Sequence, residues 1–221
     1  MLRENLRKEL KDLEKELVKM GEMTITAIKR SVEALKSRDA DEARKIISDD
    51  LLINKKRWEI EERCVNLIAT QQPVATDLRE IIALLDIITD LERIGDNAAG
   101  IARIVIKIGD EPLLKPLIDI PRMMEKATDM IRRSIKAFLR RDAEAARAIC
   151  KEDDEVDALY HQVYRELLSF MIEDPRTITR ATHLMRAARK LERIADRATN
   201  ICERTVFLVT GEMWEVNSPD P

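Results

Sequence analysis

Two acidic side chains spaced four residues apart occur once in each half of the sequence. Glu92 and Asp96 lie in the segment LERIGDNAAGIAR, and Glu192 and Asp196 lie in LERIADRATNICE, one hundred positions later. In a helix, residues four apart lie on the same face. Because hard cations prefer carboxylate oxygens as ligands, each pair is a candidate part of a metal site.

A second set of oxygen-bearing side chains lies upstream of each pair. Asp50 and Asn54 correspond, at an offset of 103, to Asp153 and Asp157. If the helices that carry the two sets run antiparallel, the sets meet and form an oxygen-rich cluster suited to Mg²⁺, Mn²⁺ or iron. Two metal sites are therefore predicted. The first, with the neutral Asn54, should bind more weakly than the second.

The acidic pairs also have a simpler explanation. The chain is 37% charged, so acidic residues four apart arise by chance on solvated helix faces. Arg93 and Arg193, which follow the two glutamates directly, could pair with them. The recurrence of the pairs at matched positions, among small residues such as Gly95 and Ala195, counts against this explanation and leaves both hypotheses open.

The composition is that of an all-α protein. Aromatic residues make up 3% of the 221 residues, and there are 5 Gly and 7 Pro, which leaves few turn-forming positions. The formal net charge of −3 offers no broad cationic surface, so we do not expect nucleic-acid binding. Three cysteines, Cys64, Cys150 and Cys202, fall in helical patterns, and we expect them to be buried hydrophobic residues.

Neither a signal segment nor a membrane span is predicted. The N-terminal segment MLRENLRKELKDLEKEL has no apolar stretch, and no apolar run approaches the roughly 20 residues of a span. We therefore expect a cytoplasmic protein without direct membrane insertion. Any association with the inner face of the membrane should come through protein partners.

Breaks at Ser37-Arg38-Asp39, Gln72-Pro73, Gly109 to Pro112, Arg141-Asp142 and Glu173 to Pro175 divide the chain. Asp39 and Asp142 are expected N-caps. Six long helices follow from these breaks, at residues 3–37, 40–69, 74–108, 121–140, 143–172 and 177–210.

The second half of the chain repeats the first. SVEALKSRDADEARKI from Ser31 and SIKAFLRRDAEAARAI from Ser134 share 8 of 16 residues, and DLERIGDNAAGI and KLERIADRATNI share 7 of 12. A repeat of this length indicates a duplicated domain. We therefore predict two tandem, pseudo-symmetric three-helix bundles with up-down helices, at residues 1–111 and 112–211, followed by an irregular tail at 212–221.

The segment PVATDLREIIALLDIITDLERIGDNAAGIAR, from Pro73 to Arg103, resembles the phosphate-uptake regulator (PhoU) family. That family carries the pattern E-x-x-x-D once in each of two three-helix bundles. The resemblance extends over nearly the whole chain and is looser in the second repeat, where Ala195 replaces Gly95. An asparagine that often follows the pattern by four residues is present as Asn200, whereas the first repeat has Gly100.

The resemblance implies a non-enzymatic, cytoplasmic regulator of phosphate homeostasis. It implies two kinds of partner: the phosphate ABC transporter, contacted through its nucleotide-binding subunit, and a sensor histidine kinase to which the regulator relays the state of the transporter. The regulator thereby holds phosphate-starvation genes off. It also implies homodimers and metal clusters on the acidic surfaces, with iron, Mg, Mn or Zn as candidates. Asn200 joins the metal ligands on this basis alone.

Two alternatives come from other classes of protein. A ferritin-like di-iron protein needs Glu-x-x-His pairs, and neither His161 nor His183 follows a Glu by three residues, which argues strongly against it. A purely structural or dimerising bundle would leave the acidic pairs dispensable. No nucleophile–base pattern or Gly-rich phosphate loop supports catalysis.

Overall fold

The computed structural model describes residues 2–215, and for residues 2 and 3 it describes the backbone alone. The described chain is all-α and contains no strand. Its elements are α1 (Leu2–Ser37), α2 (Ala40–Gln71), α3 (Thr76–Ile108), α4 (Asp119–Arg140), α5 (Ala143–Cys150), α6 (Asp153–Glu173), the 3-10 helix η1 (Pro175–Thr177) and α7 (Ile178–Thr210). The all-α prediction is therefore confirmed.

The helix ends follow from side-chain and backbone capping. Asp39 caps α2 by accepting a hydrogen bond from the Glu42 amide at 2.8 Å, and Asp142 caps α5 by accepting one from the Ala145 amide at 2.9 Å. Both predicted N-caps are confirmed, and each satisfies an amide that has no partner within its helix. At the other end, Gly211 adopts a left-handed conformation after α7, which glycine does without strain.

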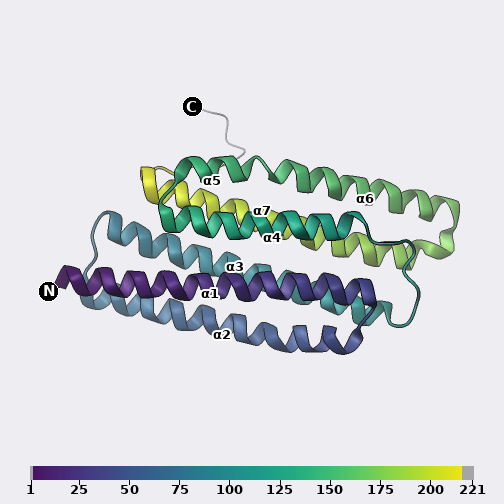
Figure 1. Cartoon of the computed structure of the whole chain (residues 1–221), viewed down its shortest axis with the longest axis horizontal. Helices are drawn as coiled ribbons and strands as arrows, with labels where there is room; N and C mark the ends of the chain where they lie inside the picture. Colours follow the sequence, from purple (N-terminus) through teal and green to yellow (C-terminus); the bar gives the residue numbers. More distant parts are fainter. Residues whose placement is uncertain (1, 216–221) are drawn as a thin grey trace.

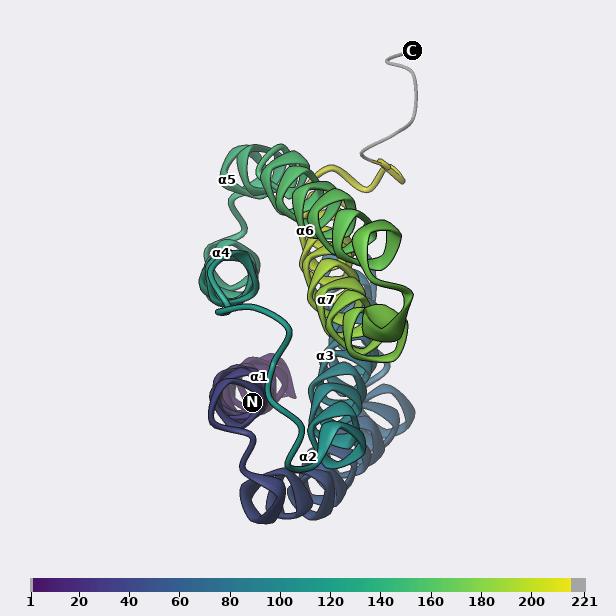
Figure 2. The same ribbon diagram turned by 90° about the vertical axis from the view of Figure 1, so that its right-hand side faces the viewer.

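Helices α1–α3 form one bundle and α4–α7 form the other (Figure 1). Seen end-on, α2, α3, α7 and α6 lie side by side as a layer, and α1 and α4 cover one face of that layer (Figure 2). The buried apolar side chains of both bundles form one continuous core. The central helices α3 and α7 carry most of the contact between the bundles.

One predicted helix is wrong. Residues 143–172 do not form a single helix, because the chain turns at Lys151 and Glu152 between α5 and α6. Two backbone bonds of the tighter i to i−3 type close this turn, from the Glu152 amide to the Ile149 carbonyl at 3.0 Å and from the Glu155 amide to the Glu152 carbonyl at 3.1 Å. The acidic run at 152–155 favours a new helix start, since negative charge stabilises a helix N-terminus.

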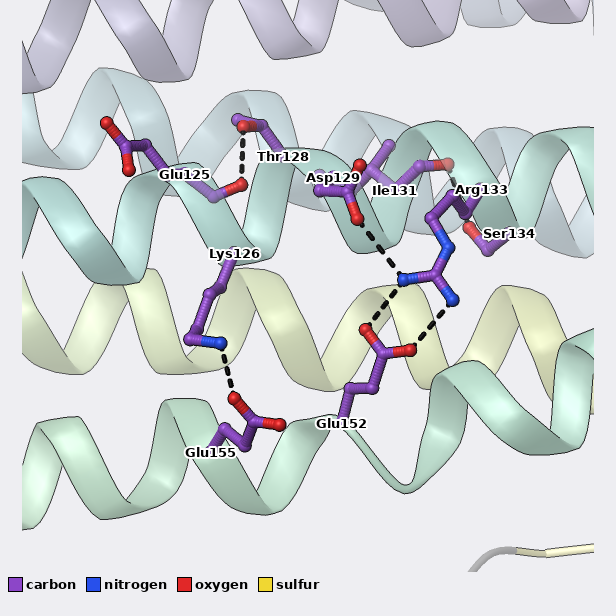
Figure 3. A network of polar contacts seen from close by, with 9 residues as sticks. All are labelled: Glu125, Lys126, Thr128, Asp129, Ile131, Arg133, Ser134, Glu152 and Glu155. Carbon is purple, nitrogen blue, oxygen red and sulfur yellow. Dashed lines mark hydrogen bonds and ion pairs between the residues drawn. The ribbon is translucent and has the colours of Figure 1, made fainter.

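A salt bridge from α4 holds the turn (Figure 3). Arg133 donates two hydrogen bonds of 2.7 Å to the two carboxylate oxygens of Glu152. The first bundle has the matching pair at an offset of 103, in which Arg30 donates to Asp49 at 2.7 Å. There the helix α2 continues without a break.

The interface between α3 and α7 has approximate two-fold symmetry. Arg197 forms an ion pair with Asp90 at 3.3 Å. Lys190 donates to Asn97 at 3.4 Å. At an offset of one hundred, Lys190 corresponds to Asp90 and Asn97 corresponds to Arg197. The second pair is therefore the first pair with the two helices exchanged. This reciprocal pattern is that of a dimer interface built around a two-fold axis.

The remaining expectations concern cysteines and ends. Cys64, Cys150 and Cys202 are free and buried, as predicted. Within the described chain, no helix is both long enough and apolar enough to cross a membrane. Residues 212–215 are irregular, and the rest of the predicted tail lies outside the described residues.

Candidate metal centre

The first acidic cluster lies between α2 and α3. Asp50 of α2 is only 7% exposed and packs against Gly95 of α3. A Cβ atom on Gly95 would lie 3.1 Å from the Asp50 Oδ1 atom and 3.0 Å from the Ile53 Cδ1 atom. The absent side chain at Gly95 therefore lets the two helices approach at the predicted site.

Burial and like charge raise the pKa values in this cluster. Burial has the largest effect on Asp50 and, with Asp96 and then Glu92 adding repulsion and Arg103 opposing them, raises its pKa to about 6. The pKa of Glu92 is raised first by burial and then by Asp96. Asp50 of α2 therefore lies within electrostatic reach of Glu92 and Asp96 of α3.

The second acidic cluster lies between α6 and α7. Burial, followed by Asp196, Asp157 and Glu192, raises the pKa of Asp153 to about 7. The pKa of Glu192 is also raised to about 7, by burial and then by Asp196. Asp153 is the first residue of α6, where the helix dipole favours the charged form. The raised pKa means that burial and the neighbouring carboxylates outweigh that effect.

Several of these oxygens lack a hydrogen-bond partner. Four buried atoms of the predicted ligands are unpaired: Asp50 Oδ1, Asn54 Oδ1, Asp153 Oδ1 and Glu192 Oε2. A buried polar atom without a partner is costly, and a hard cation would satisfy these oxygens. These carboxylate and amide oxygens therefore have the chemistry that a hard metal ion requires of its ligands. Among the described residues, however, no three Asp, Glu, His or Cys side chains already converge on one point, so the side chains would have to close around it.

Two further expectations concern Asn200 as a metal ligand and Arg93 and Arg193 as ion-pair partners of the acidic pairs. The Asn200 side-chain amide donates to Asp90 of α3 at 3.2 Å, so this amide nitrogen serves the interface between the bundles. Arg93 and Arg193, the alternative partners of the acidic pairs, form no ion pair within the described part of the chain. Glu192 instead pairs with Arg189 one turn before it.

A basic pocket that the sequence did not predict lies beside the clusters. A cavity of about 480 Å³ opens between α3 and α7. Five cationic side chains, one acidic and one amide side chain line it: Arg93, Arg103, Lys190, Arg193, Arg197, Asp96 and Asn97. The repeated arginine of the two LERI segments was the available signal, but only the antiparallel packing of α3 and α7 brings its two copies to one pocket.

The chain matches the family model described as "PhoU domain" over residues 17–105 and again over residues 120–205. It is 39% identical over 218 residues to the phosphate-specific transport system accessory protein PhoU homolog of Clostridium acetobutylicum, covering 98% of this chain and 100% of that one. It is 41% identical to the homolog of the same name from Aquifex aeolicus over 206 residues, covering 93% of each chain.

Solved structures agree with these sequence matches. The crystal structure of the phosphate transport system regulatory protein PhoU from Streptococcus pneumoniae superposes with a TM-score of 0.88 at 31% identity, covering 95% of this chain and 99% of that one. The crystal structure of PhoU from Pseudomonas aeruginosa gives 0.87 at 35% identity, covering 93% and 99%. On sequence and fold together, this chain belongs to the PhoU family.

Proposed function

We propose that the protein is a non-enzymatic accessory regulator of phosphate-specific transport. The observation that carries this proposal is similarity over nearly the full length to proteins named as accessory to that transport system. A regulator of this kind works by changing its contacts with partners, and two bundles sharing one central interface offer two similar surfaces for such contacts.

The proposed partners are the nucleotide-binding subunit of the phosphate transporter and a sensor histidine kinase. The protein would act at the cytoplasmic face of the membrane, as a homodimer, and would reach the membrane only through these proteins. A pull-down with the purified nucleotide-binding subunit tests the first contact. Binding to anionic lipid vesicles with no partner present would contradict the proposal that membrane association needs a protein.

The proposed regulatory ligand is a hard metal ion at each acidic cluster. Asp50, Asn54, Glu92 and Asp96 would hold one ion or cluster, and Asp153, Asp157, Glu192 and Asp196 the other. The unpaired buried oxygens and the raised pKa values support this proposal. A bound cation supplies positive charge that removes the repulsion between the carboxylates, so that helices α2 and α3, or α6 and α7, are held together more firmly.

Calorimetric titration of chelator-treated protein with Mg²⁺, Mn²⁺ and Fe³⁺ tests the metal sites. We expect saturable binding and a higher melting temperature, since a ligand that binds only the folded state stabilises it. The variants Glu92→Gln/Asp96→Asn and Glu192→Gln/Asp196→Asn should each lose one site. Glu125→Gln, an exposed glutamate outside both clusters, serves as the matched control.

The alternative is a purely structural, dimerising bundle. Its support is that no ready-made metal geometry exists among the described side chains. If wild type and both cluster variants show the same melting shift with metal, the acidic clusters are solvated charge and this alternative holds.

A further inference from the structure

The basic pocket between α3 and α7 has more positive charge than its own carboxylate can balance. Five cationic side chains line it, and Asp96 is its single acidic residue. Only one of the five cations, Arg197, forms an ion pair within the described chain, with Asp90 at 3.3 Å. Arg93, Arg103 and Arg193 therefore present guanidinium groups to the cavity without a carboxylate in contact.

Lys190 is fixed at this pocket rather than free in solvent. Its side chain is half-buried, and its ammonium group donates to the Asn97 side-chain oxygen at 3.4 Å. Its stem lies directly over Gly100, where an added Cβ atom would clash with the Lys190 Cε atom. The glycine thus makes room for a cation whose contact is a neutral amide instead of a carboxylate.

Cationic side chains without carboxylate partners around a cavity favour the binding of an anion. Charge-assisted hydrogen bonds from arginine and lysine are strong, and the planar guanidinium group matches the oxygens of phosphate. The cavity volume of about 480 Å³ is ample for one tetrahedral oxyanion with water. Carboxylates of the acidic clusters interact electrostatically with Arg93, Arg103 and Arg193, but within the described chain none of them forms an ion pair with these arginines.

The remaining lining groups indicate which oxyanion fits. Asp96 and Asn97 supply the oxygen acceptors of the lining, since a carboxylate and an amide oxygen both accept hydrogen bonds. Hydrogen phosphate carries one hydroxyl that can donate to such an acceptor. Sulfate and the dianion of a phosphate monoester have none, so the carboxylate would repel them.

We propose that the pocket lined by Arg93, Arg103, Lys190, Arg193 and Arg197 binds free hydrogen phosphate. The five cations hold the oxygens, and Asp96 accepts the hydroxyl of the anion. This inference goes beyond the proposed transport role and shares only Asp96 with the proposed metal ligands, so titration of chelator-treated protein tests it apart from metal binding.

The test is calorimetric titration of the full, chelator-treated chain at pH 7.5 with inorganic phosphate, with sulfate and with phosphoserine. We expect saturable binding of phosphate, with sulfate and phosphoserine weaker by about tenfold or more. Arg193→Gln should weaken phosphate binding by about tenfold, and Gly100→Ala should weaken it by displacing Lys190. Asp96→Asn should bring the affinities for phosphate and sulfate close together.

Arg186→Gln is the matched control, because Arg186 is an exposed arginine of α7 outside the pocket; it should change phosphate affinity by less than about twofold. Helical circular dichroism establishes that each variant is folded. The proposal is overturned if wild type binds no phosphate, if sulfate binds as tightly as phosphate, or if Arg193→Gln behaves like the control. Loss of transporter binding with phosphate binding intact would reject the transport role and leave this inference standing.

Discussion

Replacing Glu192 by glutamine should stabilise the metal-free protein above neutral pH. Glutamine has nearly the same shape and carries no charge, so it removes the repulsion from Asp196 while keeping the packing of α7. Glu192 is 7% exposed, and its pKa is raised from 4.5 to about 7. A shift of this size corresponds to at most about 3 kcal/mol of unfavourable free energy for the charged form.

The pH dependence of stability gives the sign of the change expected for Glu192→Gln. Because the folded pKa lies above the unfolded value, the penalty is complete above about pH 7 and is relieved as the pH falls toward 4.5. The ion pair with Arg189 is lost in the variant but contributes little, since that arginine is half exposed. We therefore expect a net gain of about 1–3 kcal/mol at pH 8 and almost none near pH 4.5.

Thermal unfolding followed by circular dichroism at both pH values measures this difference. For a chain of this size, the gain corresponds to a rise of about 3–9 °C at pH 8. Glu125→Gln, the exposed control, should shift the melting temperature by no more than about 1–2 °C at either pH. A Glu192→Gln variant that is less stable than wild type at pH 8, or equally stabilised at both pH values, would refute the reasoning from burial and like charge.

Three further outcomes follow from the same contacts. Gly95→Ala should destabilise the protein by about 1–2 kcal/mol in urea unfolding, because the new methyl group crowds Ile53 and Asp50; no loss would mean that the two helices separate freely there. Arg133→Gln should cost less than about 1 kcal/mol, since the pair with Glu152 is partly exposed, yet it should speed amide hydrogen exchange at residues 151–155 more than Arg30→Gln does in the unbroken α2. Adding Mn²⁺ to wild type at pH 7.5 should release protons from the clusters, because carboxylates with raised pKa values must ionise to bind the metal; calorimetry in two buffers of different ionisation enthalpy measures this, and an absence of proton release upon binding would contradict the assignment of these ligands.

Much of the fold could be predicted because its signals are local. Asp39 and Asp142 cap helices through amides three residues on, and the repeated LERI segments mark the two central helices. The spacing of Glu92 and Asp96, copied one hundred positions later, marks pairs that lie within electrostatic reach of Asp50 and Asp153 on the preceding α-helices.

The parts that sequence reasoning missed depend on contacts between distant helices. At the break after Cys150, Arg133 of α4 binds Glu152 at the start of α6, but the matching pair of Arg30 and Asp49 leaves α2 unbroken, so this contact alone does not cause the break. The basic pocket follows from the antiparallel pairing of α3 with α7. A helical pattern within either repeat cannot reveal that Arg93 and Arg193 share one cavity.

The pairing of α3 with α7 also explains why the pocket carries a net positive charge. Two identical repeats around a two-fold axis would place the same residue at positions 90 and 190, and each would meet the same partners. In this chain Asp90 neutralises Arg197 and accepts from Asn200, whereas Lys190 meets the neutral Asn97 and the open space over Gly100. Divergence after duplication has therefore left one copy of the contact neutral and the other cationic, so that an anion-binding pocket arises at the symmetric junction between two acidic clusters.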